Sequence, residues 1–178
     1  MTMSEQMPHM AAGGRAQASR RVFEEGWSQG RLEVFDELLA PDFTAHDPQD
    51  LFPERRGPIA GRATCEMYRA AFPDVRMNVE DVIEAGDRVV IRWRATGTHE
   101  GELMGLAPTG RSVEVTGIAI DRWAGDRIAE TWVNWDTHGL LQQIGAAPAH
   151  GSLGEKVGIR MQRTITRIAQ RRRGHAMR

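Results

Sequence analysis

Cysteine and lysine are almost absent from this chain of 178 residues. Cys65 is the single cysteine, so no disulfide can form within the chain, and a buried thiol without a chemical role is expected. Lys156 is the single lysine beside 22 arginines, a bias that we attribute to the coding sequence rather than to function. No cysteine–histidine set has the spacing of a metal site, so no metal ligands are expected.

Long apolar runs are missing as well. No stretch approaches the roughly 18 apolar residues of a membrane span. The opening sequence, MTMSEQMPHMAAGG, has neither the basic nor the apolar region of a signal peptide, so a cytoplasmic protein is expected. There is also no glycine-rich phosphate loop.

The formal net charge is −1, and so the chain as a whole indicates neither nucleic-acid binding nor an anionic membrane as partner. This average hides an asymmetry. The first 148 residues carry 15 basic and 23 acidic groups, whereas residues 149–178 carry eight basic groups and one acidic group. The C-terminal segment is therefore treated separately.

Three regions are predicted along the chain. Residues 1–14 are small, polar and rich in methionine, and are predicted to be a disordered arm; residues 15–148 form the folded domain; residues 149–178 form a basic amphipathic tail. Apolar periodicity predicts a helix that ends at Gln29–Gly30, a second that ends at Pro41, and a third over about 60–72.

After residue 74 the apolar pattern changes to period two. Two hairpins are predicted, with turns at EAGD and AGDR, followed by a short helix, THGLLQQIG, and a short strand is also predicted earlier, at 43–45. Helices segregated from antiparallel strands indicate an α+β fold. For the tail, three interpretations remain open: a helix docked on its own body or on a sister subunit, a helix that binds a membrane surface or partner, or disorder.

The stretch ETWVNWDTHGLLQQIG places a carboxylate at the end of the last predicted strand. Because side chains alternate along a strand, Trp132, Asn134 and Asp136 are expected to share one face unless a bulge changes the alternation. On the concave face, Asp136 would be a proton-transfer group whose pKa burial raises. The alternative is that Asp136 caps the helix that begins at Thr137.

Three separated blocks of the sequence carry a resemblance. They are GWSQGRLEVFDELLAPDFTAHDP, RAAFPDVRMNVEDVIEAGDRVVIRWRATGTHEGELMGLAPTGRSVEVTGIAIDRW and RIAETWVNWDTHGLLQQIGAAP. Together they resemble the SnoaL-like polyketide cyclase family of the nuclear-transport-factor-2-like superfamily, from about Val22 to Pro148. The resemblance implies a cone-shaped barrel, in which a curved antiparallel sheet surrounds a cavity and N-terminal helices pack against it.

The resemblance also implies a chemistry. The family's cyclases use neither metal nor organic cofactor and close a ring by an intramolecular aldol step. Their catalytic aspartate would match Asp136, and their cavity histidine would match His46. In the reaction that we predict, His46 and Asn134, the latter on the face of Asp136, donate hydrogen bonds to the reacting oxygens. The family forms dimers or tetramers through the outer face of the sheet, where Arg92 and Arg94 are expected to point.

Four further residues are candidates for the cavity wall. Trp132, Trp93, His99 and Tyr68 could each contact a substrate, although packing roles for the aromatic residues and a turn role for His99 remain open. The sequence therefore predicts a cofactor-free cyclase of polycarbonyl small molecules. Two alternatives are an epoxide hydrolase-like or hydroxylase-like enzyme on the same scaffold, and a ligand-binding or assembly module without catalysis.

Overall fold

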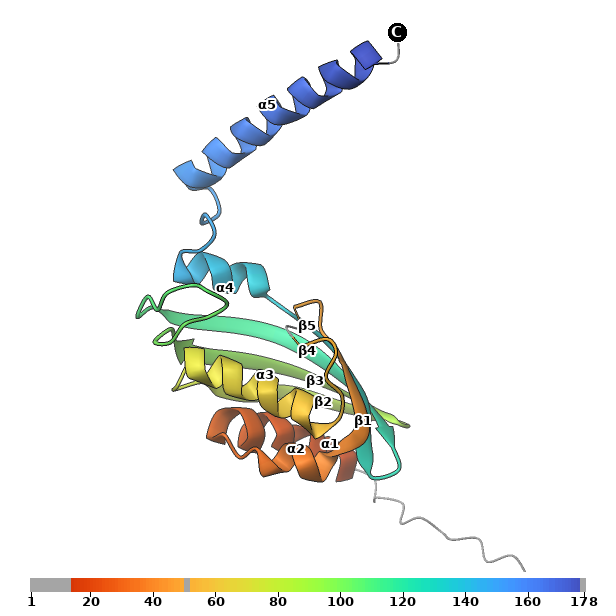
Figure 1. Ribbon diagram of the computed structural model, residues 1–178. Helices are drawn as coiled ribbons and strands as arrows, with labels where there is room; N and C mark the ends of the chain where they lie inside the picture. The colour runs from red at the N-terminus through yellow and green to blue at the C-terminus, as the bar shows by residue number, and fades with distance from the viewer. Residues whose placement is uncertain (1–13, 50–51, 177–178) are drawn as a thin grey trace, which may run out of the picture.

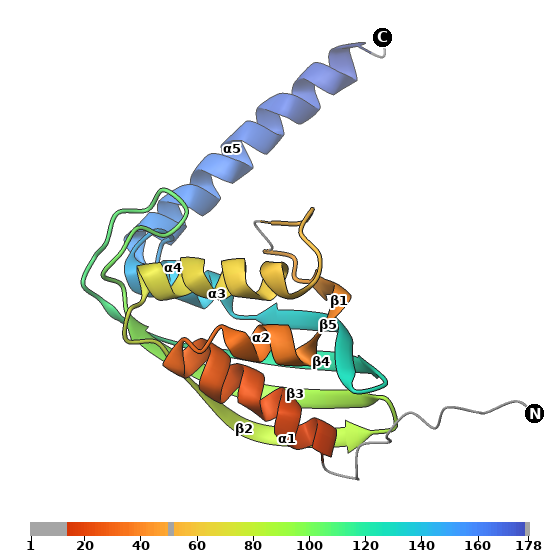
Figure 2. The ribbon, with the colours of Figure 1, turned by 60° about the horizontal axis from the view of Figure 1, so that its bottom comes forward.

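The computed structural model describes residues 14–49 and 52–176, with side chains up to residue 167. It confirms the predicted α+β class: one curved five-stranded sheet has helices gathered against one face (Figures 1 and 2). The predicted N-terminal arm lies outside the described residues except for Gly14, at which the first helix begins. 

The sheet has the strand order β1-β5-β4-β3-β2. Its strands are β1 (Leu39–His46), β2 (Arg76–Ala85), β3 (Arg88–Thr98), β4 (Ser112–Ala124) and β5 (Arg127–Trp135). The two predicted hairpins are β2–β3 and β4–β5, and they join antiparallel through β3 and β4. The short strand predicted at 43–45 is the centre of β1, which pairs parallel with β5 at the sheet edge.

Helices cover the inner face of the sheet and continue beyond it. They are α1 (Gly14–Arg21), the π-helical segment η1 (Val22–Trp27), α2 (Glu33–Leu38), α3 (Pro58–Ala71), α4 (Thr137–Ile144) and α5 (Leu153–Ala176). Gly30 ends the first helical segment with a φ of 71°, as the sequence predicted, because glycine adopts a positive φ without a steric penalty. Pro58 begins α3, where a missing N–H costs no hydrogen bond.

Both hairpins turn on the same four residues, Ala-Gly-Asp-Arg, at 85–88 and 124–127. Gly86 and Gly125 each have a φ of 64°, which a two-residue hairpin turn requires. Arg15 of α1 donates to the carbonyl oxygens of Gly86, at 2.8 Å, and of Gly125, at 3.3 Å. One side chain therefore fixes the start of α1 against both turns.

The alternation of side chains is regular along β4 but not along β5. On β4, Val113, Val115 and Asp121 all face the helices. On β5, Ile128 faces the helices, but the register then shifts: Arg122 pairs with Glu130 whereas Trp123 pairs with Ile128. Residue 129 is thus a β-bulge, and from there on the odd-numbered residues of β5 face inward.

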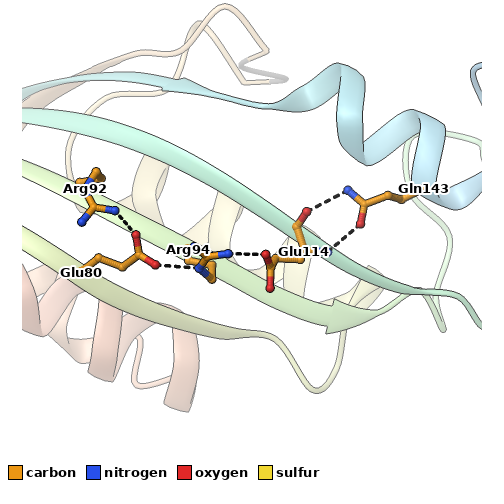
Figure 3. A network of polar contacts seen from close by, with 5 residues as sticks. All are labelled: Glu80, Arg92, Arg94, Glu114 and Gln143. Atoms are coloured by element: carbon orange, nitrogen blue, oxygen red, sulfur yellow. Dashed lines mark hydrogen bonds and ion pairs between the residues drawn. The ribbon is translucent and has the colours of Figure 1, made fainter. Parts of the chain in front are cut away.

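The outer face of the sheet carries a chain of polar contacts (Figure 3). Glu80 on β2 accepts from Arg92 and, at 2.7 Å, from Nε of Arg94, and Arg94 also pairs with Glu114. The Gln143 amide of α4 bonds the backbone of Glu114 twice, each at 2.8 Å. The predicted outward direction of Arg92 and Arg94 is confirmed, and a subunit interface on this face stays a prediction.

The C-terminal tail forms the helix α5, which extends away from the rest of the molecule (Figures 1 and 2). Side chains cap its start: Ser152 Oγ accepts from the Glu155 N–H at 3.2 Å, and Glu155 accepts from the Gly151 N–H at 2.6 Å. The helix α5 does not pack against the folded domain of its own chain, which was one of the positions that the sequence left open. In the described part of the chain, no helix combines the length and the apolar character that crossing a bilayer requires.

Candidate active site

A cavity of about 190 Å³ lies between the inner face of the sheet and the helices. Its walls are mainly apolar and aromatic. Residues from the helices include Phe23, Trp27, Phe35, Thr64 and Tyr68; residues from the sheet include Met77, Trp93, Val115, Asp121, Thr131 and Trp135. Such a space suits a largely apolar ligand that a few polar groups orient.

Asp121 is a carboxylate in the wall of this cavity, on β4, and only 3% of the residue is exposed. Its Oδ2 accepts a hydrogen bond from Ser19 Oγ and its Oδ1 accepts one from Thr131 Oγ1, both at 2.7 Å. Burial raises the pKa of Asp121 to about 6, while the bonds from the two hydroxyls act in the opposite direction. A carboxylate with this pKa can both take up and return a proton near neutral pH.

The position of Asp121 is fixed by three elements. Ser19 belongs to α1 and is fully buried, and it also accepts a hydrogen bond from Nε1 of Trp123 at 3.3 Å. Trp123 is itself buried, which confirms its predicted packing role. Because α1 and β5 each contribute one partner to the carboxylate on β4, it is held in one orientation before any ligand binds.

Trp93 supplies a second polar group inside the cavity. It is 4% exposed, and its indole nitrogen Nε1 is a buried donor with no acceptor among the described residues. Its ring lies over Gly117, where an added Cβ would come within 2.3 Å of Trp93 Cζ2. Gly117 thus leaves the space that the indole occupies.

An aromatic group lies at another part of the wall. Tyr68 of α3 packs against Trp27, at 6.0 Å between ring centroids, and meets Trp135 edge to face at 5.9 Å. All three residues line the cavity. The predictions that Tyr68 and Trp93 reach the cavity are therefore confirmed in position, while contact with a substrate stays a prediction.

The predicted inward position of Asp136 is wrong. Asp136 is exposed and begins α4 as its N-cap, with Oδ1 accepting from the Gly139 N–H at 2.8 Å. The β-bulge at residue 129 is the reason, because it reverses the alternation along the rest of β5. The structure instead shows the alternative that the sequence left open, in which Asp136 caps the helix that begins at Thr137.

The same reversal places Asn134 and Trp132 on the outer face. Asn134 is exposed in a shallow hollow beside Arg92 and Arg94. His46 is exposed too: its Nε2 lies 3.1 Å from Glu130, and its ring stacks on Trp132 at 4.9 Å. The predicted cavity positions of these residues are therefore wrong, and none of them lines the wall that holds Asp121.

His99 is fully buried but lies behind the cavity rather than in its wall. Its Nδ1 is 3.1 Å from Thr109 Oγ1, and its ring packs at 5.3 Å on Phe72, which does line the cavity. The backbone of His99 also accepts from Thr109 and Gly110. This geometry agrees with the turn role that the sequence left open for His99.

Comparison with known proteins identifies the fold. The family model for the SnoaL-like polyketide cyclases matches residues 17–144. The chain belongs to the SnoaL-like polyketide cyclase family. No curated protein sequence matches the chain.

Solved structures agree with the assignment of this chain to the SnoaL-like family. IdmH from Streptomyces antibioticus is 32% identical, with a TM-score of 0.64, over 72% of this chain and 96% of that one. A SnoaL-like protein from Jannaschia sp. CCS1 is 28% identical, with a TM-score of 0.64, over 74% and 92% of the two chains. TsrD from Streptomyces laurentii has a TM-score of 0.70 over 78% and 100%, and its 23% identity shows the shared fold alone.

Two other kinds of site can be assessed in this SnoaL-like domain. Within residues 14–49 and 52–176, no three metal-ligating side chains converge. The sequence GWSQG, at Gly26–Gly30, has the spacing of a serine-hydrolase nucleophile, but Ser28 is buried at a helix end. Its hydroxyl bonds the backbone of Phe23 and Met77, so it has a structural role.

Asp121, Ser19 and Thr131 are the site residues that the sequence analysis missed. A signal was present for Asp121, because it continues the inward alternation of Val113, Val115 and Ala119 and puts a charge on an apolar face. Ser19 likewise interrupts the apolar side of its helix. A charged residue at an inward position in a strand is a site candidate in its own right.

Proposed function

We propose that the protein is a cofactor-independent cyclase that closes a ring in a polyketide-like or other polycarbonyl small molecule by an intramolecular aldol step. The observation that carries the proposal is the buried Asp121 carboxylate in the wall of a mainly apolar cavity. Membership of the SnoaL-like family supports it. Asp121 takes the acid–base role that the sequence analysis gave to Asp136, because Asp136 faces outward.

The proposed reaction needs one group that moves a proton. Asp121 removes an acidic proton from the carbon between two carbonyl groups, which leaves an enolate. The enolate carbon then forms a bond to the carbon of a further carbonyl group in the same molecule, and the oxygen of that group becomes an alkoxide. The alkoxide then takes the proton back from Asp121, so the product is an isomer of the substrate. The apolar walls favour the reaction by holding the flexible chain in a folded pose.

Trp93 marks a second part of the cavity wall, on the strand next to that of Asp121. On β3, Trp93 pairs with Gly117 of β4. Asp121 of β4 pairs with Val89, which lies four residues before Trp93 on β3. At about 3.3 Å per residue, these backbone positions lie about 13 Å apart. The two residues therefore mark separate parts of the cavity wall, four positions apart along the strands.

The epoxide hydrolase-like alternative receives less support. That chemistry was expected to use two carboxylates and an arginine. Among the described residues that line the cavity there are two carboxylates, Asp121 and Asp47, but no arginine. The mainly apolar wall without a cation also favours a neutral ligand, such as an ester, over a free acid.

Proton exchange gives a direct test of the proposed function. A polyketide-like methyl ester with a 1,3-dicarbonyl group, incubated with the protein in D₂O, is expected to exchange its central proton and then to cyclise. NMR spectroscopy follows both events against the rate without protein. Saturable binding of the ester without any acceleration of exchange would contradict the proposal and would support the ligand-binding module instead.

A further inference from the structure

The helix α5 exposes a row of apolar side chains that nothing in the described chain covers. Leu153, Val157, Met161 and Ile165 recur every four residues, and 78%, 53%, 63% and 59% of each residue is exposed. We call these four residues the apolar stripe. Monomeric proteins rarely leave so continuous an apolar row in water, and such rows mark surfaces that bind something.

A row of cations runs beside the apolar stripe. Lys156, Arg160, Arg163 and Arg167 are exposed, and none of them forms an ion pair or a side-chain hydrogen bond within the described part of the chain. We call them the basic row. At 3.6 residues per turn, the centre of the basic row lies about a third of a turn around the helix axis from the centre of the apolar stripe. A surface that accepts both rows must be apolar and anionic side by side.

The basic row disfavours antiparallel pairing of α5 with a second copy. Two copies that paired antiparallel through their apolar stripes would bring the two basic rows together, and like charges at such short range destabilise pairing. The body of the chain is also a poor partner. Its exposed large apolar residues, among them Ile59, Ile83 and Ile118, stand on separate elements. Glu80 and Glu114 already bind arginines.

We propose that α5 binds the surface of an anionic lipid bilayer. The helix lies parallel to the surface, with the apolar stripe in the boundary between headgroups and acyl chains and the basic row at the lipid phosphates. The long arginine side chains reach the phosphates while their stems cover apolar surface. This inference does not depend on the proposed reaction.

Vesicle sedimentation with the full chain tests the proposal. The protein is expected to sediment with vesicles of phosphatidylcholine and phosphatidylglycerol, but not with vesicles of phosphatidylcholine alone, and to be released as ionic strength rises. Equal binding to both kinds of vesicle, or binding to neither, would overturn the proposal.

Two neighbouring variants provide a matched pair. Met161→Asp and Gln162→Asp add the same charge to the same turn, but Met161 alone lies in the apolar stripe. We expect Met161→Asp to weaken binding to the anionic vesicles about tenfold more than Gln162→Asp does. Equal losses would overturn the proposal. So would a wild-type dimer, measured by light scattering, that Met161→Asp dissociates without any change in vesicle binding.

Discussion

Asp121→Asn is expected to lower turnover by about 10²- to 10⁴-fold, the usual contribution of a positioned general base. Asparagine has nearly the same shape as aspartate and can still meet Ser19 and Thr131, but it cannot accept the substrate proton. The rate of ring closure or proton exchange on a polycarbonyl ester measures the effect. A variant that keeps wild-type turnover would remove Asp121 from the mechanism.

The same variant is expected to be more stable than the wild type at alkaline pH, which separates lost chemistry from misfolding. The pKa of Asp121 is raised to about 6 in the folded protein, so its contribution to stability is present below the unfolded pKa of about 3.9 and is lost as pH rises through 6. Above pH 7 the ionised group therefore costs about 1–3 kcal/mol. Urea unfolding at pH 8 should show that Asp121→Asn recovers part of this free energy.

Asp136→Asn is the matched control. Asparagine is as good an N-cap as aspartate, so the bond to the Gly139 N–H survives while the carboxylate is lost. Turnover is expected to change less than about twofold, in line with a residue outside the machinery. A large loss of turnover in Asp136→Asn, together with normal turnover in Asp121→Asn, would instead support Asp136 as the proton-transfer group, as the sequence analysis predicted.

The dependence of the reaction on pH is expected to follow the ionisation of Asp121. Because the base is the carboxylate form, kcat/KM should rise with pH to a plateau above pH 6 and fall tenfold per unit below it. At pH 4 the rate should be about 100-fold below the plateau. A pH-rate series in which unfolding is monitored in parallel gives the measurement.

Thr131→Val provides the control for this profile. The substitution keeps the size of the side chain and removes the hydroxyl that donates to Asp121 Oδ1, a bond that lowers the pKa of Asp121. The inflection of kcat/KM is therefore expected to move to higher pH. An inflection that stays in place would indicate that another group titrates, and so would contradict the assignment.

Local patterns predicted those parts of the fold that depend on neighbouring residues. Period-two alternation placed Trp93 inward and Arg92 and Arg94 outward, and both positions are observed. The glycines of the Ala-Gly-Asp-Arg turns marked both hairpins. The parallel pairing of β1 with β5 was out of reach, because it joins segments more than 80 residues apart and leaves no local signal.

The position of the reactive carboxylate was predicted wrongly for a specific reason. A bulge at residue 129 reverses the faces of β5, and the sequence RIAETWVNW contains neither glycine nor proline to mark it. The regular alternation of β4 would have been a better guide, since it brings Asp121 inward in line with Val113, Val115 and Ala119. A long strand without a bulge, such as β4, therefore supports an argument from side-chain alternation better than β5, the last strand in the sequence.

A ¹³C NMR titration of the Asp121 carboxyl group tests the central claim most directly. The resonance is assigned by its absence from Asp121→Asn, and its shift is followed from pH 3 to pH 9 in the folded protein. We predict an inflection near pH 6, as expected for a carboxylate that the cavity wall shields from water. An inflection near the value of a free aspartate, about 3.9, would contradict the account.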